Sequence, residues 1–302
     1  MGGDFPERPV RLIVGNAPGG GTDVAARLIA QKLSGMWPQP VIVESRPGAS
    51  GMIGADQVAK ASADGYTLLL SPQTSTAIAA NMNRQLPYDV INDFTHLSVI
   101  ASVPTVLVVG AASPFKSFEE FAAHAKAKPD ALNFGSGGVG STQHLAGEML
   151  NLALGTKMQH VPYQGENPAV SDLLNGQLGA MFMTLSTAAP HIDSGRMRAL
   201  AIASLERAKS APDIPTIDES GIPGFEMSPW YGLFGPKGVP PEVAQKIYGS
   251  VQEVLWQPDV QEHFSRLGFV LLGTSPDEAS AYMRDEIAKY ARLVTAANIG
   301  VQ

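Results

Sequence analysis

Short apolar runs alternate with amphipathic segments along the first part of the chain. Residues 10–15, 41–45 and 66–71 are apolar runs of strand length, whereas 22–33 and 53–61 carry apolar residues at helical spacing. Strands that alternate with helices favour parallel βαβ units. The N-terminal segment therefore predicts an α/β sheet.

The alternation continues in a second run and resumes after a Pro-rich stretch at 211–225. The same reasoning predicts strands at 97–102, 105–110, 132–136, 158–163, 178–183, 197–203 and 230–238, and helices at 117–127, 141–152, 168–175, 241–256, 258–267 and 276–298. Ser117 and Glu120 have the spacing of a capping box at the start of their helix. The last helix is expected to pack through Ile287, Ala291 and Val294.

Composition narrows the class of protein. With 302 residues, 44% of them hydrophobic, the chain can fill two cores. The net charge is -7 and no run of Lys and Arg could neutralise a phosphate backbone, so nucleic acid is not an expected partner. The absence of cysteine removes disulfides, thiolate metal sites and thiol nucleophiles. No apolar stretch approaches the roughly 18 residues of a membrane-spanning helix.

Two glycine-rich segments share one design, in which a strand ends, glycines make a turn and a helix begins. The first contains Gly19, Gly20 and Gly21, and the second runs from Gly135 to Gly140. Glycine lets backbone N–H groups approach a ligand, and the first turn of a helix favours an anion. Each segment is a candidate anion site, with an ordinary βα turn as the alternative.

The second segment, GSGGVG, also fits the dinucleotide pattern G-x-G-x-x-G. No Asp or Glu follows where the ribose would be bound, because that place holds residues 158–161, and no P-loop lysine is present. We find no nucleophile elbow and no H-E-x-x-H motif, and the six histidines lack metal-ligand spacing. His144 could orient the second loop, and Asp23 is predicted to cap its helix or to pair with Arg27.

The chain resembles the Bug-type solute-binding proteins of tripartite tricarboxylate transporters over essentially its whole length. The marks that carry this resemblance, in family order, are FPERPVRLIV, PGGGTDVAAR, VIVESRPGASGMIGADQVA, ADGYTLLL, FGSGGVGSTQHLAGEML, VPYQGENPAVSDLLNGQLGAMF, GRMRALAIAS, IPTIDESGIPGFE and WYGLFGPKGVP. No single mark is decisive, but eight or more in series are specific.

The resemblance implies an α/β, two-lobed periplasmic-binding-protein-like (Venus flytrap) fold, each lobe a mixed sheet flanked by helices. One lobe would combine residues 1–103 and 225–302, the other would hold 104–224, and a ligand cleft would lie between them. It also implies a monomeric periplasmic receptor, whose signal peptide has been removed, that delivers a small organic carboxylate to a membrane permease. No enzymatic activity, cofactor or metal is expected.

Carried over residue by residue, the resemblance assigns ligand contacts to both glycine-rich loops and to neighbouring segments. The implied ligand-binding residues are Gly19, Gly20, Gly21, Asp23, Thr74, Ser75, Ser136, Gly137, Val139, Gly140, Ser141, Thr142, His144, Tyr163 and Thr184. Asp23 and Glu166 are the only acids in these loops, so a dicarboxylate or an aromatic acid is expected rather than an amino acid. The alternatives are an α/β enzyme, or a cytosolic sensor, that uses the loops for a phosphate or nucleotide.

Overall fold

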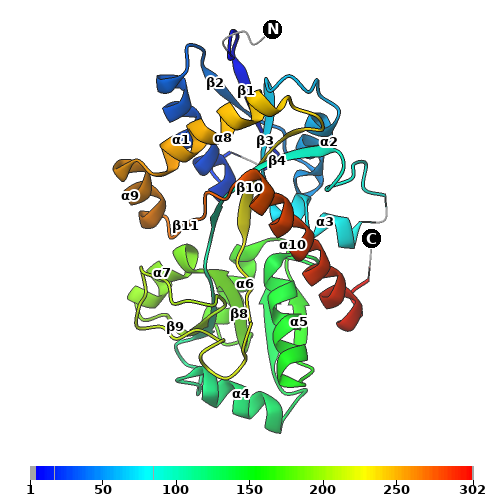
Figure 1. The fold of residues 1–302 in the computed structure, drawn as a ribbon. Helices are drawn as coiled ribbons and strands as arrows, with labels where there is room; N and C mark the ends of the chain where they lie inside the picture. The colour runs from blue at the N-terminus through cyan, green and yellow to red at the C-terminus, as the bar shows by residue number, and fades with distance from the viewer. Residues whose placement is uncertain (1–4, 17, 84, 301–302) are drawn as a thin grey trace. The chain divides into compact units, whose positions relative to one another are not determined.

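A computed structural model describes residues 5–16, 18–83 and 85–300 (Figure 1), and the Met-Gly-Gly start lies outside these ranges. The chain forms two compact units. Unit 1 takes its described residues from 1–102, 230–291 and 300–302, and unit 2 consists of 103–229 and 292–299. The assignment of the predicted lobes, 1–103 with 225–302 and 104–224, to the two sides of a ligand cleft stays a prediction. In the described ranges, no helix is both long and apolar enough to cross a membrane.

Unit 1 is built on a six-stranded mixed sheet with the order β11-β4-β10-β3-β1-β2. The strands are β1 (Val10–Val14), β2 (Val41–Ser45), β3 (Thr67–Pro72), β4 (Phe94–Ser102), β10 (Trp230–Pro236) and β11 (Val270–Leu271). Strand β1 pairs in parallel with both β2 and β3, whereas β10 runs antiparallel to β3 and β4. The N-terminal βαβ units are thus joined to a later strand, β10, that returns from unit 2.

Helices of unit 1 connect and cover this sheet. They are α1 (Gly21–Met36), α2 (Met52–Ala59), α3 (Ala79–Met82), α8 (Pro241–Leu255), α9 (Pro258–Arg266) and α10 (Pro276–Ala296), with 3-10 turns η1 (Ala49–Gly51) and η2 (Gln73–Ser75). The end of α10, from Arg292, is assigned to unit 2. Helix α1 buries Ala25, Ile29 and Leu33 at the spacing that predicted it. It ends at Trp37, whose extended backbone is the one favoured before a proline.

The face that α10 buries agrees with the expected one only in part. Val294 is buried as expected, but Ile287 and Ala291 are only partly buried, and the buried stripe runs through Met283, Glu286 and Tyr290. Glu286 is tolerated there because its Oε2 accepts a hydrogen bond of 2.8 Å from the indole N–H of Trp230. An acid on the buried stripe is not visible in the spacing of apolar residues, because its burial depends on the partner that Trp230 supplies.

Unit 2 contains a five-stranded mixed sheet with the order β7-β6-β8-β5-β9. Its strands are β5 (Thr105–Gly110), β6 (Asn133–Ser136), β7 (Gln159–Pro162), β8 (Ala180–Thr184) and β9 (Met197–Ile202), and its helices are α4 (Phe118–Ala127), α5 (Thr142–Leu154), α6 (Glu166–Leu174) and α7 (Leu185–Asp193). Strand β6 is parallel to β7 and β8, and β5 is antiparallel to β8 and β9. The predicted class, mixed sheets flanked by helices, is confirmed.

Several local predictions are confirmed and others are wrong. Ser117 caps α4 by accepting a hydrogen bond of 3.3 Å from the N–H of Glu120, as the capping-box spacing predicted. Helix α7 was not predicted, and its Ser, Thr and Pro190 are weak helix formers. Strand β4 starts at Phe94, three residues earlier than expected.

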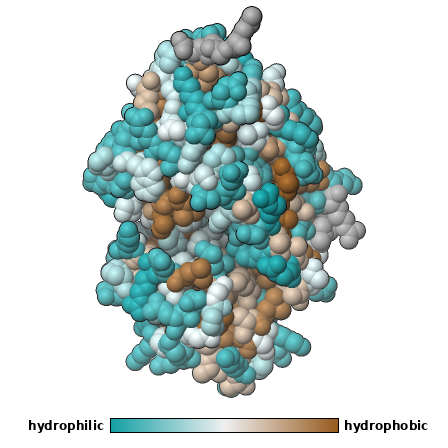
Figure 2. Space-filling model, viewed as in Figure 1, coloured by the Kyte–Doolittle hydropathy of each residue, from teal (hydrophilic) through white to brown (hydrophobic). Residues whose placement is uncertain are grey.

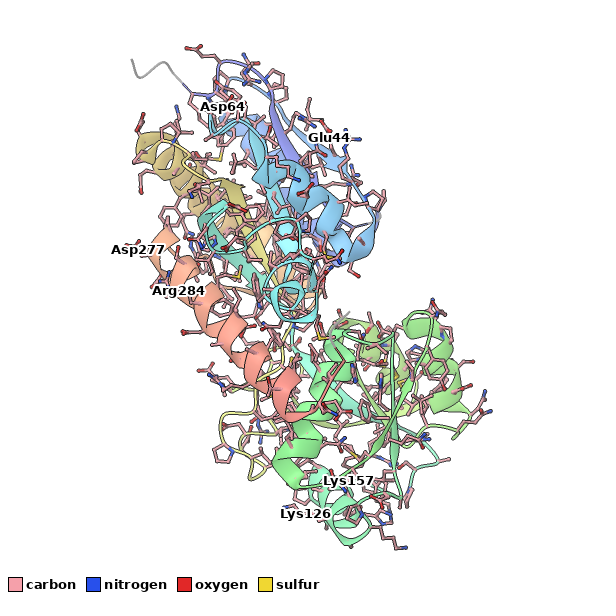
Figure 3. All side chains as sticks on the ribbon, turned by 90° about the vertical axis from the view of Figure 1, so that its right-hand side faces the viewer. Glu44, Asp64, Lys126, Lys157, Asp277 and Arg284 are labelled. Carbon is pink, nitrogen blue, oxygen red and sulfur yellow. The ribbon has the colours of Figure 1, made fainter. Side chains whose placement is uncertain are left out.

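Hydrophilic residues predominate on the face drawn in Figure 2, and charged side chains lie at the free edge of the unit 1 sheet. On the face drawn in Figure 2, hydrophobic residues lie in small groups among hydrophilic ones. At the edge strand β2, Glu44 (labelled in Figure 3) accepts hydrogen bonds from Arg11 at 2.7 Å and Arg46 at 3.0 Å. These guanidinium groups, Arg11 foremost, lower the pKa of Glu44 to about 2. Charges on an edge strand disfavour pairing with another chain.

Candidate ligand-binding loops

In unit 1, the first glycine-rich loop lies at a point where the strand order reverses. Strand β1 leads through α1 to β2 on one side of the sheet, while its other parallel neighbour, β3, leads toward β4 on the far side. Ligands of α/β sheets bind outside the carboxyl ends of the strands at such a switch point. After β1 the chain reaches Gly19, Gly20 and Gly21, and after β3 it reaches Thr74 and Ser75. These residues were predicted to contact a ligand.

Unit 2 repeats this arrangement around β6 and β8. Strand β6 leads through α5 to β7, while its parallel neighbour β8 leads through α7 to β9 at the opposite edge. The segments after these strand ends are the second glycine-rich loop and the start of α7. Each unit therefore places most of its predicted residues at its own switch point, whereas Tyr163 follows the edge strand β7.

Asp23 ties the first loop to its helix. Its side chain is 3% exposed, and Oδ2 accepts hydrogen bonds from the Gly19 N–H at 3.0 Å and from Arg27 Nε at 2.8 Å. The Arg27 hydrogen bond is the main cause that lowers the pKa of Asp23. Gly19 has a φ of 87°, which glycine adopts without strain. The structure thus shows both the predicted Arg27 pair and a loop-fixing role for Asp23.

Glycines allow close approaches around this switch point. A Cβ on Gly21 would lie 2.6 Å from the hydroxyl oxygen of Tyr231, whose burial raises its pKa to about 12. A Cβ on Gly15 would lie 2.5 Å from the carbonyl oxygen of Gly51, and one on Gly51 would lie 3.0 Å from Ser75 Oγ. The segment around Gly51 therefore lies between the two segments that were predicted to contact a ligand. The sequence analysis did not predict this position of Gly51.

The two predicted residues after β3 differ in exposure. Ser75 is fully buried, its Oγ lies 2.6 Å from Ser71 Oγ, and its carbonyl oxygen accepts a hydrogen bond of 2.6 Å from the Tyr88 hydroxyl. Thr74 is partly exposed. Of this pair, only Thr74 has a side chain open to a ligand within its own unit.

In the second loop, side chains fix some of the backbone amides. Ser136 Oγ accepts a hydrogen bond of 3.1 Å from the Gly138 N–H, and His144 Nδ1 accepts one of 3.1 Å from the Gly140 N–H. Ser141 caps α5, because its Oγ accepts a hydrogen bond from the His144 N–H at 3.2 Å. Within the described ranges, the N–H groups of Gly137 and Val139 donate to no protein acceptor. These two amides can serve an anion.

Two stacked imidazoles hold the loop from its side. The rings of His144 and His160 lie 3.8 Å apart at 16°, and Phe134 stacks on the other face of the pair at 5.1 Å from His160. His160 Nε2 is 2.6 Å from Ser136 Oγ, so each imidazole anchors one side of the loop. Burial lowers the pKa of His144 to about 4, and burial together with the neighbouring His144 lowers the pKa of His160 to about 4. Neutral His144 can accept the Gly140 N–H.

The sequence reading foresaw an orienting role for His144 but missed His160. His160 follows no motif, and only the pairing of β6 with β7 sets it opposite Phe134. Such a partner is found from strand register and not from spacing along the chain.

The two remaining predicted residues of unit 2, Tyr163 and Thr184, both form hydrogen bonds with other side chains of the protein. The Tyr163 hydroxyl donates a hydrogen bond of 2.5 Å to Asp172, which occupies it within the protein. Thr184 occupies the N-cap position of α7 without a side-chain capping hydrogen bond, and its Oγ1 lies 2.9 Å from Thr187 Oγ1. Thr187 Oγ1 in turn donates to Glu166 Oε1 at 3.2 Å. Thr184 thus belongs to a hydroxyl network that ends on a carboxylate.

Comparison with known proteins gives the family context. The family model described as "Tripartite tricarboxylate transporter family receptor" matches residues 25–299. Protein BugT of Bordetella pertussis is 38% identical over 291 residues, 96% of this chain and 89% of that protein. A protein of R. palustris solved with adipate is 33% identical with a TM-score of 0.83, covering 98% of this chain and 99% of the other. MatC of Rhodopseudomonas palustris with bound malate is 32% identical with a TM-score of 0.79, covering 96% and 100%.

Proposed function

Because the chain belongs to the receptor family of tripartite tricarboxylate transporters, we propose that it captures a small organic carboxylate in the periplasm and delivers it to the permease of such a transporter. The ligand is a dicarboxylate or an aromatic acid. The protein acts as an exported monomer and releases the acid chemically unchanged.

The observation that carries this proposal is the second loop. Its side-chain anchors leave the N–H groups of Gly137 and Val139 for an anion, directly before the first turn of α5. Two R. palustris relatives were solved with adipate and with malate, which are both dicarboxylates. The same chemistry in this chain would use the amides for one carboxylate group.

Binding energy argues that the loops of both units contribute. An amide hydrogen bond to a charged group contributes about 1.5 to 3 kcal/mol, so two such bonds give roughly 3 to 6 kcal/mol. Association costs at least about 4 kcal/mol, and micromolar affinity requires about 8 kcal/mol net. The two amides of the second loop alone are too weak for micromolar affinity, so we propose that the amides around Gly20 and Gly21 in the first loop are ligand-binding as well.

A matched pair of glycine variants tests the site. Gly140 and Gly176 have nearly the same backbone, with φ of 77° and 74°, but Gly176 lies between α6 and β8, away from the second loop. Alanine at either position costs about 1 to 2 kcal/mol of backbone strain. We expect both variants to lose similar stability and only Gly140→Ala to weaken ligand affinity, by at least about tenfold.

The ligand for this comparison comes from a thermal-stability screen of organic acids. An acid at about 100 times its dissociation constant adds roughly 2.7 kcal/mol to the free energy of unfolding. Equal affinity losses in Gly140→Ala and Gly176→Ala would reject the second loop as the site. Conversion of the bound acid to a product, seen by NMR, would reject the receptor function in favour of an enzyme.

A further inference from the structure

Glu166 is an acid at the unit 2 switch point that the carboxylate site does not explain. It is the first residue of α6 and is partly buried, and in the described part of the chain it takes part in no ion pair. Its partners are neutral: Gln143 Nε2 donates to Oε2 at 3.5 Å and Thr187 Oγ1 donates to Oε1 at 3.2 Å. Burial raises the pKa of this carboxyl, because desolvation outweighs the Thr187 hydrogen bond.

The position of Glu166 places it beside the anion-binding amides. A Cβ on Gly137 would lie 3.4 Å from the backbone nitrogen of Glu166 and 3.7 Å from Gln143 Oε1. Gln143 belongs to the first turn of α5, and Thr187 belongs to the first turn of α7. The carboxylate is thus held among the first turns of three helices, at the ends of β6 and β8.

An ionised carboxylate in this place has a chemical consequence for the ligand. Two neutral donors leave most of its four lone-pair positions open as acceptors. A ligand that brings only carboxylate and hydrocarbon next to it would bury a negative charge without a partner, which is unfavourable. A ligand with an O–H or N–H group can donate to it instead, and hydrogen bonds to charged groups are the stronger ones.

We propose that Glu166 selects, among small carboxylates, those that also carry an O–H or N–H donor. The inference rests on the proposed carboxylate-binding function and narrows its ligand class. A hydroxyl and an ammonium share the required chemistry, and an ammonium would also neutralise the charge. The expectation against amino acids counted Asp23 and Glu166 as the only acids of these loops. Asp23 is paired with Arg27, but Glu166 has no ion pair among the described residues and can therefore accept a hydrogen bond from an ammonium.

The test is calorimetric titration of the full chain with acids that differ only in the donor. Suitable sets are succinate, malate and aspartate, and benzoate with 4-hydroxybenzoate. For the set that binds, we expect the wild-type protein to prefer a donor-bearing member over the plain acid by about tenfold or more. In Glu166→Ala this preference should fall to within about threefold, because the plain acid no longer faces the carboxylate.

Two further variants show whether the ligand preference depends on the charge of Glu166, on its acceptor oxygen atoms, or on any acid in a first helical turn. Glu166→Gln keeps an acceptor but loses the charge, so a hydroxyl preference should partly persist while an ammonium preference disappears. Glu119→Gln removes an exposed acid from the first turn of α4 and serves as the control for a general effect of a first-turn carboxylate. The control should keep the wild-type preference.

The possible results distinguish a failure of this inference from a failure of the proposed receptor function. If wild-type protein binds plain and donor-bearing acids equally well, or if Glu166→Ala keeps the full preference, the receptor function stands and the role of Glu166 is rejected. If no acid in any set binds the wild-type protein, the inference fails together with the proposed function for these ligands.

Discussion

The stacked histidines of the second loop should make the protein sensitive to mild acid. His144 is 6% exposed and accepts the Gly140 N–H at Nδ1, which a proton would block. Its pKa falls from 6.5 to about 4 on burial. Between these two values the unfolded chain binds more protons than the folded one, so stability rises with pH. The stabilisation is complete above about pH 6.5 and is lost as the pH falls toward about 4.

The size of the effect follows from the same two values. A single histidine with this shift contributes about 2.5 kcal/mol less stability at about pH 4.5 than at about pH 7.5. Urea unfolding at several pH values, followed by circular dichroism, measures this loss. His144→Asn keeps an acceptor for Gly140 without the titrating ring, so its loss between these pH values should be smaller by about 2 kcal/mol.

A second histidine provides the control. His263 lies on α9 in unit 1, so His263→Asn should keep the wild-type pH dependence. If His144→Asn and the wild-type protein lose the same stability on acidification, the histidine pair does not hold the loop as described.

Three other substitutions test the division of roles in the loops. Ser136→Ala removes the acceptor of the Gly138 N–H and should destabilise unit 2 by about 1 to 3 kcal/mol in urea unfolding while weakening ligand affinity in calorimetry; unchanged affinity would contradict the anchoring role. Asp23→Ala should cost about 1 to 3 kcal/mol, because Gly19 and Arg27 lose their shared acceptor, and a loss no larger than that of an exposed acid would count against it. Tyr163→Phe should lower stability by about 1 kcal/mol but leave ligand affinity within about twofold, since its hydroxyl is bound to Asp172; a large loss of affinity would show that the hydroxyl also serves the ligand.

Local signals along the chain predicted much of the fold because each acts within a few residues. The apolar period gave α1, and Ser117 with Glu120 marked the start of α4. Helix α7 escaped prediction because its first turn and Pro190 carry weak helix formers, and its stability comes from packing on β5, β8 and β9.

The candidate site was predictable only in its glycine-rich loops. Glycine runs after strands indicate close backbone approach, but they do not tell which amides are already satisfied within the protein. The roles of His160 and Glu166 depend on neighbours 24 and 21 residues away, Ser136 and Thr187, which meet them only when the sheet has formed. Strand register and helix docking decide such contacts, and neither is visible in the spacing of residues.

The central claim, capture of an acid through its carboxylate group, is tested most directly by titrating the wild-type protein with an acid from the screen and with its methyl ester and carboxamide. Backbone amides recognise the charged group, so the acid should bind once per chain with micromolar or tighter affinity and be recovered unchanged, while the neutral analogues bind at least about a hundredfold more weakly. Equal affinity for the acid and its ester would contradict the account.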